Sequence, residues 1–459
     1  MSSPIMLAKP EEIDTPEKRS KYTVTIIGCE QAGMFHAVLF ADAGFKVICV
    51  DKDQTRVNNI TKCKLVGLKG DMESRFRGYL KTGRLDATTD IKKAVSQSDI
   101  IAITVPTKID SKKKPDYSDI RNACRIVGPN LRGGSIVFNM SIAGIGATDA
   151  IVKETLENSS GYKAGAHFAV VYAPIPPSRC STLETVIDYQ RIAATSDKKA
   201  LQVGAAILES VTKKAVCTTE STRTAEAATL FEIAREDTDV AVANELAYFC
   251  EKLGVDYFEA QKLINHNPDN QSLLRAVANR HIDEEPYILL EDAENLSMKL
   301  KVSSAAREIN EEMARHAANL AKDALRNCGK TLKRARVVLL GISETLNTRG
   351  PTSHVAKEIA DTFETRGAKL TLYDPYFSEK ELAEMQHNPK KTLSDSLDGT
   401  DCIVLLVAHE QFKKMSLNRL KHVMKMPAAI VDLTGTFEPA KVEKEGFIYR
   451  GLGRGVWTK

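Results

Sequence analysis

Short runs of β-branched and apolar residues recur through the first half of the chain. They are TVTIIG (23–28), KVICVD (46–51), DIIAITVPT (99–107), GGSIVFNMS (133–141) and HFAVVYAP (167–174). Runs of this kind are typical of strands that are buried on both faces. A stretch with helical spacing separates the first two runs, so strand, helix and strand follow one another within about 30 residues. The pattern predicts a parallel, doubly wound sheet.

The pattern changes after about residue 218, where apolar residues recur at steps of three and four. This spacing predicts one long helix that ends at Gly254, and further helices continue to about Leu325. A second α/β block then begins with ARVVLLG and continues through KLTLYDP, DCIVLLVAH, AAIVDL and GFIYRGLGRG. Each α/β block opens with strand, glycine and helix, and each leads to a strand that ends in aspartate, Asp51 or Asp374.

The order of these segments predicts four parts of the chain. Residues 1–21 are polar and rich in charges, so we expect a flexible tail there. We expect an N-terminal Rossmann-like domain over 22–217, a central helical domain over 218–328 and a C-terminal Rossmann-like domain over 329–459. The expected fold class is therefore α/β, with two Rossmann-like, doubly wound domains joined by a helical domain that contains a long helix.

Composition restricts the classes of partner and the compartment. The 459 residues include 64 Lys and Arg against 60 Asp and Glu, and the net charge of +4 is too small to indicate nucleic acid or an anionic membrane. No apolar run approaches the length of a membrane span, and the N-terminus lacks the apolar stretch of a secretory signal. The nine cysteines form no CxxC pair, so we expect reduced thiols in the cytoplasm and no metal site.

The segment IIGCEQAG (26–33) lies where a dinucleotide-binding GxGxxG fingerprint would lie. Gly28 and Gly33 match its outer glycines, and Asp51 matches the acid that binds the ribose hydroxyls, which favours NAD over NADP. Glu30 replaces the middle glycine, and its side chain would obstruct the pyrophosphate. Repulsion between the Glu30 carboxylate and the pyrophosphate would weaken binding by about 4 kcal/mol, for charges about 4 Å apart in an effective dielectric of about 20. Two hypotheses stay open: a working NAD site, or a Rossmann-type domain that no longer binds a dinucleotide.

Further segments carry a family resemblance through their order and spacing. They are VDKDQTRV, ITVPT with PDYS, SIAGIGAT, YAP, AEAATLFEIAREDTDVAVANELAYFCEKLGVD, AREINEEM, YDP and YRGLGRG. Together they resemble the UDP-glucose/GDP-mannose dehydrogenase superfamily, especially its UDP-N-acetylmannosamine dehydrogenase branch, over about residues 22–456. Members of this family use NAD twice to oxidise the C6 alcohol of a nucleotide sugar, through a thioester on a cysteine.

The resemblance implies where the ligands would lie. Asp51 and Arg56 would contact the cofactor ribose, and Thr107 belongs to the segment that lies near the nicotinamide in the family. Ser141, in the segment SIAGIGAT, would also bind the cofactor. A UDP-sugar or another nucleotide would bind the C-terminal domain. In the family the long central helix forms much of a dimer interface, so the resemblance also implies a homodimer.

The catalytic positions of the family carry other residue types in this sequence. The cysteine position falls on His281, the lysine on Thr229, the asparagine on Ile233 and the glutamate on Ile175. The lysine and arginine that hold substrate in the family fall on Thr345 and Thr352. No cysteine occurs between Cys250 and Cys328, so no shift of register restores the nucleophile. Threonine supplies no positive charge, and isoleucine neither donates nor accepts a hydrogen bond.

Other residues are candidates for new roles. His281 with Glu284 and Glu285 would suit an acid–base pair or a metal, or these side chains are simply solvated. Cys180 is a candidate replacement nucleophile or an ordinary loop thiol. The lysines at 108 and 112–114 would attract phosphates or form a solvated loop.

Three functions stay open, in this order of preference. The first is a diverged member of the nucleotide-sugar dehydrogenase family that lacks the four-electron oxidation, a pseudoenzyme with a binding, regulatory or scaffolding role. The second is an NAD-dependent oxidoreductase that acts on a nucleotide sugar or another alcohol with altered chemistry. The third is the ordinary UDP-sugar dehydrogenase reaction, for which a nucleophile is missing. Whether the protein is an enzyme is left open by the sequence.

Overall fold

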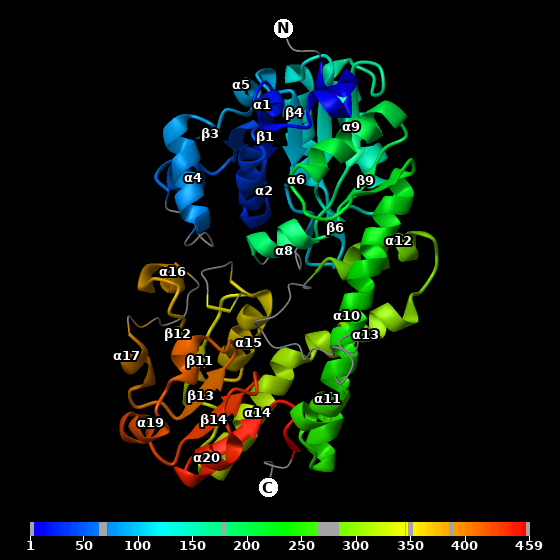
Figure 1. Cartoon of the computed structure of the whole chain (residues 1–459). Helices are drawn as coiled ribbons and strands as arrows, with labels where there is room; N and C mark the ends of the chain where they lie inside the picture. Colours follow the sequence, from blue (N-terminus) through cyan, green and yellow to red (C-terminus); the bar gives the residue numbers. More distant parts are fainter. Residues whose placement is uncertain are drawn as a thin grey trace. The chain divides into compact units, whose positions relative to one another are not determined.

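The computed structural model describes residues 4–63, 71–176, 180, 182–264, 284–344, 346–347, 352–384, 390 and 392–455. The chain divides into two compact units (Figure 1). The first unit contains residues 1–234 and 284–300, and the second contains residues 235–283 and 301–459. The segment predicted as a central helical domain is therefore shared between the two units.

The first unit is built on an eight-stranded sheet in the order β10-β9-β8-β7-β4-β1-β2-β3. Its strands are β1 (Thr23–Ile27), β2 (Lys46–Val50), β3 (Leu85–Thr88), β4 (Ile100–Ile103), β7 (Ser135–Asn139), β8 (Phe168–Tyr172), β9 (Ile192–Ala194) and β10 (Cys217–Thr219). All neighbours pair in parallel except β8 and β9, which are antiparallel. The five apolar runs of the sequence form the five adjacent strands from β8 to β2.

Helices cover both faces of this sheet, because alternate strand residues point to opposite sides. In β4, Ile100 and Ala102 join the apolar cluster beneath α2 and α9, whereas Ile101 and Ile103 join the cluster beneath α6 and α7. The helices of this unit are α1 (Pro16–Arg19), α2 (Gln31–Asp42), α3 (Gln54–Thr61), α4 (Asp71–Thr82), α5 (Ile91–Ser96), α6 (Ser118–Val127), α7 (Glu154–Ser160), α8 (Leu183–Asp188), α9 (Lys198–Glu209) and α12 (Pro286–Asn295). A short ribbon, β5 (Lys108–Ile109) with β6 (Pro115–Asp116), follows β4.

The N-terminal segment is packed against the first unit, so the predicted flexible tail is wrong for residues 4–21. Ile5, Met6 and Ile13 are buried in the same apolar cluster as α2 and α9. The Met6 amide donates to the carbonyl of Gly134 at 3.0 Å. Arg19 is buried and donates to two backbone carbonyls. Three apolar side chains among many charges are too few for a sequence pattern to reveal, but they are enough to anchor a short segment.

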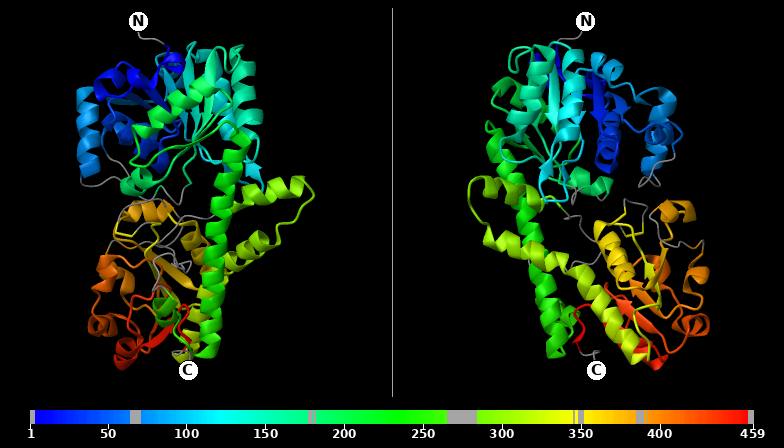
Figure 2. Two further views of the ribbon diagram at one scale, coloured as in Figure 1. Left: turned by 45° about the vertical axis from the view of Figure 1, so that its right-hand side comes forward. Right: turned by 180° about the vertical axis from the view of Figure 1, so that it is seen from behind.

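The long helix of the prediction is α10 (Thr222–Leu253), and Gly254 ends it with φ +74°. Figure 2 shows it as one continuous helix in both views. The predicted boundary after residue 217 falls inside β10, since the strand extends to Thr219. None of the described helices has both the length and the apolar character that crossing a membrane requires.

The second unit contains a five-stranded parallel sheet in the order β12-β11-β13-β14-β15. Its strands are β11 (Arg336–Leu340), β12 (Lys369–Tyr373), β13 (Cys402–Leu405), β14 (Ala429–Asp432) and β15 (Ile448–Gly451). Its helices include α11 (Tyr257–Ile264), α13 (Lys301–Glu311), α14 (Met313–Asn327), α15 (His354–Thr365), α17 (Leu393–Leu397), α19 (Leu417–Val423) and α20 (Pro439–Lys444). Val337 and Leu339 point to the cluster with α14 and α15, and Val338 and Leu340 to the opposite cluster.

Candidate functional site

The turn between β1 and α2 keeps the backbone geometry of a phosphate-binding loop. Gly28 has φ +95°, and its amide donates to the Val50 carbonyl at 2.9 Å. A Cβ atom on Gly33 would lie 1.9 Å from the Gly28 carbonyl oxygen. The Thr104 hydroxyl donates to the same oxygen at 2.6 Å, which fixes the turn from the other side. Both glycines are therefore required by close contacts, as the fingerprint predicts.

The Glu30 carboxylate is paired with Arg56 and not with the first turn of α2. It is the N-cap residue of α2, but its side chain accepts no capping hydrogen bond. Its carboxylate instead lies 3.3 Å from the guanidinium of Arg56, with more than half of the side chain exposed. The first turn of α2 is thus not capped by this carboxylate, and its backbone amides are not used by Glu30.

Asp51 stands at the end of β2, where the ribose-binding acid of a Rossmann fold is found. Its Oδ2 accepts from the Cys29 amide at 2.8 Å and from Arg56 at 2.9 Å. Burial alone would lower the pKa of Arg56, but the hydrogen bond to Asp51 raises it. Asp51 is buried, and Arg56 bridges it to Glu30. Glu30, Asp51 and Arg56 therefore form one charged network beside the turn between β1 and α2.

Thr107 and Ser141 lie where two neighbouring strands end. The Ser141 hydroxyl donates to the Val105 carbonyl at 2.6 Å, and the Thr107 hydroxyl donates to the Ile142 carbonyl. Because β4 and β7 are adjacent and parallel, these bonds join the two loops at the carboxyl edge of the sheet. The structure thus places both residues at the same edge as the phosphate turn, and each donates its hydroxyl proton to the protein itself.

The positions in the first unit that the resemblance predicts as catalytic offer no charge. The Thr229 hydroxyl donates to the Ala225 carbonyl one turn back along α10, at 2.9 Å. Ile233 follows one turn later, and Ile175 follows β8; both are buried. Isoleucine has no polar atom to direct at a substrate, and the proton of Thr229 is already used within its helix.

A set of contacts that the sequence does not reveal holds the loop after β7. Four amides of this loop donate to side chains from distant elements: Gly144 to the Tyr117 hydroxyl at 2.9 Å, Ile145 to Asp292 at 2.7 Å, and Gly146 and Thr148 to Glu226 at 2.6 and 2.8 Å. Burial raises the pKa of Glu226 and of Asp292, and it raises the pKa of Tyr117 to about 12.

These loop contacts fill a cradle of backbone amides with the protein's own groups. The partners lie 78 to 147 residues from Ile145, Gly146 and Thr148 in sequence, and no local pattern connects them. Glu226 belongs to the segment AEAATL, which carries part of the family resemblance, but the resemblance implies no role for it. These four amides are therefore already occupied by groups of the protein.

The candidate nucleophile Cys180 is not activated, and neither is Cys250 near the end of α10. Cys180 is buried, and burial raises the pKa of its thiol to about 12. Cys250 is half-buried with its pKa raised in the same direction by burial. A thiolate is the reactive form, so these shifts disfavour attack at neutral pH. His281 and Thr345 lie outside the described residues.

Glu285 and Thr352, two further residues predicted for the site, lie just before helices. Glu285 is the N-cap residue of α12, although its side chain forms no capping bond. Thr352 forms an isolated antiparallel bridge with Ser343, just before α15. The described residues hold no group of three or more His, Cys, Asp or Glu side chains arranged for a metal ion.

The lysine run after β4 is engaged by carboxylates of the same unit. Lys108 lies 2.6 Å from Asp119, and Lys114 lies 3.0 Å from Glu291 on α12. Lys113 lies over the ring of Tyr287, 4.9 Å from its centroid. These side chains are exposed, and such pairs contribute little stability. The geometry favours the solvated-loop interpretation over a dedicated phosphate patch.

The second unit repeats the strand–glycine–aspartate arrangement, with a different use of the acid. Gly341 has φ +84°, and Asp374 at the end of β12 accepts from the amides of Ile342 and Ser343 at 2.9 and 3.0 Å. His409 Nε2 donates to the same oxygen at 3.2 Å. Burial would raise the pKa of Asp374, but the bond from His409 lowers it. Both residues are buried, so Asp374 holds the turn after β11 to His409 in the interior of the unit.

Comparison with known protein families assigns three consecutive stretches of this chain. The NAD binding domain of the UDP-glucose/GDP-mannose dehydrogenase family matches residues 22–216, the central domain matches 223–312, and the UDP binding domain matches 352–439. The chain belongs to the UDP-glucose/GDP-mannose dehydrogenase family. The family inferred from the sequence motifs is confirmed.

Individual relatives agree with this family over nearly their whole length. UDP-N-acetyl-D-mannosamine dehydrogenase of Methanococcus maripaludis is 27% identical over 452 residues, which are 96% of this chain and 100% of the relative. The enzyme of the same name from Methanocaldococcus jannaschii is 26% identical over 94% of this chain and 96% of its own.

Solved structures of the family have the same fold. The structure of UDP-D-ManNAc dehydrogenase from Pyrococcus horikoshii superposes with a TM-score of 0.82 and 25% identity, covering 95% of this chain and 100% of that one. A UDP-glucose dehydrogenase from Pyrobaculum islandicum gives a TM-score of 0.79 at 21% identity, covering 94% of this chain and 98% of its own. The predicted α/β fold class is confirmed.

Proposed function

We propose that this nucleotide-sugar dehydrogenase family member binds NAD in its first unit and a UDP-sugar or another nucleotide in its second, without oxidising the sugar alcohol to an acid. The observation that carries the proposal is the chemistry at positions 175, 229 and 233. The Thr229 hydroxyl donates to its own helix, and Ile175 and Ile233 are buried and apolar. The charged and amide groups that the family reaction needs there are replaced.

The four-electron oxidation depends on a thiolate and on donors to an oxyanion. The sequence has no cysteine at the family position, and the Cys180 thiol has its pKa raised to about 12 by burial. Losing one oxyanion donor costs about 10²–10³ in kcat, and here a lysine and an asparagine position are both altered. These losses act on different steps, so together they favour the pseudoenzyme hypothesis.

Support for NAD comes from the phosphate turn and from the relatives. The turn keeps both close-contact glycines, Asp51 stands at the ribose position, and Glu30 points to Arg56. The matching family domain is an NAD binding domain. When bound, NAD would supply a hydride acceptor; the residues of this chain would supply a helix N-terminus for its phosphates and an acid for its ribose. This intact turn is also what favours the second candidate, an NAD-dependent oxidoreductase with altered chemistry.

The deciding experiment measures binding and turnover on the same preparation. Calorimetric titration with NAD should show binding, and incubation with NAD plus UDP-N-acetylmannosamine or UDP-glucose should release no NADH. The Methanococcus maripaludis relative serves as the positive control for the assay. Steady NADH release with a UDP-sugar would overturn the loss of oxidation. NADH release with another alcohol would favour the second candidate, and absence of NAD binding would overturn the cofactor proposal.

We also propose that two copies associate through α10. Four exposed apolar side chains, Val242, Leu246, Phe249 and Leu253, recur at helical spacing on its second half. Such a stripe on one face of a helix is typical of a surface that another helix covers. The symmetry of a homodimer would let the same face pair with itself.

We also propose that the protein acts in the cytoplasm. Its nine cysteines are free thiols, and the cytoplasm is a compartment in which thiols stay reduced.

A further inference from the structure

Arg191 is a buried cation whose hydrogen bonds are incomplete. It precedes β9 and is 1% exposed. Its Nη1 donates to Nε2 of His36 at 2.9 Å, whereas Nε and Nη2 are buried without a hydrogen-bond partner among the described residues. Nε and Nη2 form one edge of the planar guanidinium, the edge that binds two oxygens of a carboxylate or phosphate at once.

The groups around Arg191 do not neutralise it. His36 donates from Nδ1 to the Ala32 carbonyl at 2.6 Å, so its Nε2 is an acceptor and the ring is neutral. Burial lowers the pKa of His36 to about 3, which keeps it neutral. Cys180 and Tyr189 also act on Arg191 electrostatically, but burial raises the pKa of Cys180 to about 12, and a phenol is uncharged at neutral pH.

No carboxylate meets this charge among the described residues. Arg191 forms no ion pair within 4.0 Å there, and Asp188, three residues earlier in the sequence, instead lies 3.9 Å from Lys213. Burial lowers the pKa of Arg191 to about 10, so the side chain stays charged at neutral pH. A buried charge with free donors is costly unless an opposite charge meets it.

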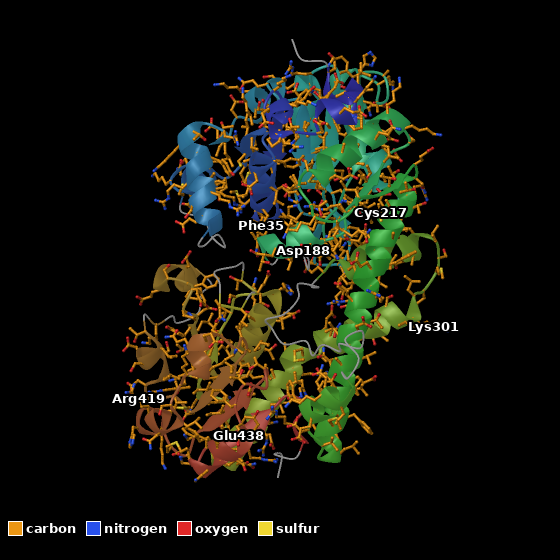
Figure 3. All side chains as sticks on the ribbon, viewed as in Figure 1. Phe35, Asp188, Cys217, Lys301, Arg419 and Glu438 are labelled. Carbon is orange, nitrogen blue, oxygen red and sulfur yellow. The ribbon has the colours of Figure 1, made fainter. Side chains whose placement is uncertain are left out.

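The position of Arg191 points to a ligand rather than to a packing accident. β9 runs antiparallel to β8, and Ala194 pairs with Tyr172, the last residue of β8. Arg191 precedes Ala194, so it lies beyond the carboxyl end of β8 and hence at the carboxyl edge of the parallel strands. His36 lies in the second turn of α2, whose first turn is the phosphate turn. Phe35 of α2 and Asp188 of α8 lie at the same end of the first unit (Figure 3). Ligands of open α/β sheets bind at this edge.

We propose that Arg191 is an anion site, and that its Nε and Nη2 bind two oxygens of a phosphate group beside the first turns of α2. The phosphate group is either free inorganic phosphate or part of a nucleotide that occupies the neighbouring turn. Both sources present the same tetrahedral oxyanion to the guanidinium edge. The site does not depend on the proposed use of NAD, since inorganic phosphate alone can fill it.

Thermal unfolding of the full chain in sodium phosphate, against sodium chloride of equal ionic strength, tests the site. A phosphate concentration about a hundredfold above the Kd of the site should raise the Tm of the unmodified protein by about 5 °C. Arg191→Met should abolish this rise. Arg19→Met is the matched control, because Arg19 is also buried but its Nε and Nη1 have carbonyl partners. It should lower the Tm and leave the phosphate-dependent rise unchanged.

A second variant and three ligands make the outcome decisive. Arg191→Lys keeps a charge but removes the two-donor edge, so phosphate should bind about tenfold more weakly in calorimetry, even if Arg191→Met fails to fold. Titration with inorganic phosphate, AMP and NAD separates the two sources: Arg191-dependent binding of phosphate alone indicates the free ion, and dependence only with AMP or NAD indicates the nucleotide. Equal responses of the unmodified protein and Arg191→Lys to all three would overturn the proposal.

Discussion

The Glu30 carboxylate lies 3.3 Å from the Arg56 guanidinium, although 26 residues separate them in sequence. This ion pair decides what the missing middle glycine means for the phosphate turn. A carboxylate directed at the helix N-terminus would repel a pyrophosphate and take the amides that should bind it. Held by Arg56, the same carboxylate stays beside α3, and Arg56 remains in contact with Asp51 at 2.9 Å. We therefore expect glutamate in place of glycine at position 30 to change the charge beside the phosphate turn more than the shape of that turn.

Replacing Glu30 by glycine should therefore have a small effect on NAD binding. We expect Glu30→Gly to tighten NAD by no more than about fivefold, because an exposed ion pair contributes about 0.2–1 kcal/mol. Calorimetric titration of both proteins measures the change. A gain of two or more orders of magnitude would show instead that the carboxylate faces the phosphates. Glu73→Gly on α4, a half-buried residue that pairs with Arg77, is the control and should leave the affinity unchanged.

Gly33→Ala should damage the same turn far more than Glu30→Gly. A Cβ atom on Gly33 would lie 1.9 Å from the Gly28 carbonyl oxygen, which is backbone and cannot move aside cheaply. We expect the free energy of unfolding to fall by about 2–3 kcal/mol and NAD binding to be lost. Gly78→Ala in α4 is the matched control, since nothing lies within 4 Å of its added methyl group. Urea unfolding should show the control slightly stabilised, and equal stability of the two variants would contradict the steric argument.

Apolar patterning predicts the centre of the first sheet and misses its edges, whereas it predicts the whole second sheet, including the edge strands β12 and β15. The runs TVTIIG and KVICVD form β1 and β2 because both faces of these strands are covered, so nearly every residue is apolar. The edge strands β3 and β10, with sequences LDAT and CTT, have polar positions and only three or four residues. Their pairing depends on a neighbouring strand that is already in place, which no local pattern encodes.

The candidate site shows the same division between local and long-range information. Gly28, Gly33 and Asp51 are predicted from sequence because a turn and a strand end fix them locally. Glu226 and Arg191 were not predicted as site residues, since their roles arise from contacts with partners 78 and 155 residues away. The Glu30–Arg56 pair was also not predicted: sequence gives both charges, but only the fold determines that they meet.

The His36 side chain should make stability depend on pH. Its pKa is about 6.5 in an unfolded chain and about 3 in the folded protein, where burial and the Arg191 charge disfavour its protonation. Its contribution is therefore fully present above about pH 6.5 and is lost as pH falls towards about 3. Between about pH 7 and pH 5 the loss should be about 2 kcal/mol. Urea unfolding measures it, and His36→Gln, which still accepts from Arg191 but does not titrate, should lose less over this range. An equal loss in both proteins would contradict this assignment.

The cysteines should react in the order of their exposure, which tests the absence of an activated nucleophile. Cys217 is exposed, whereas Cys180 and Cys124 are buried and burial raises the pKa of each thiol to about 12. We expect iodoacetamide at neutral pH to modify Cys217 first, as followed by peptide mass spectrometry. Cys217→Ser should remove the fast phase. Modification of Cys180 as fast as Cys217 in the folded protein would reveal an accessible thiolate and reopen the nucleophile hypothesis.

Charges on the exposed face of α10 should separate the proposed homodimer. Leu246 and Phe249 are 42% and 58% exposed, and a stable dimer would bury them between two helices. We expect Leu246→Glu with Phe249→Glu to convert the dimer to monomers, because each interface would then hold four unpaired carboxylates. Light scattering after size-exclusion chromatography measures the mass. Lys322→Glu, an exposed change on α14, is the control and should stay dimeric. An unmodified protein that is monomeric at micromolar concentration would contradict the proposal, as would a double variant that remains dimeric, since the stripe would then not be the surface that joins the copies.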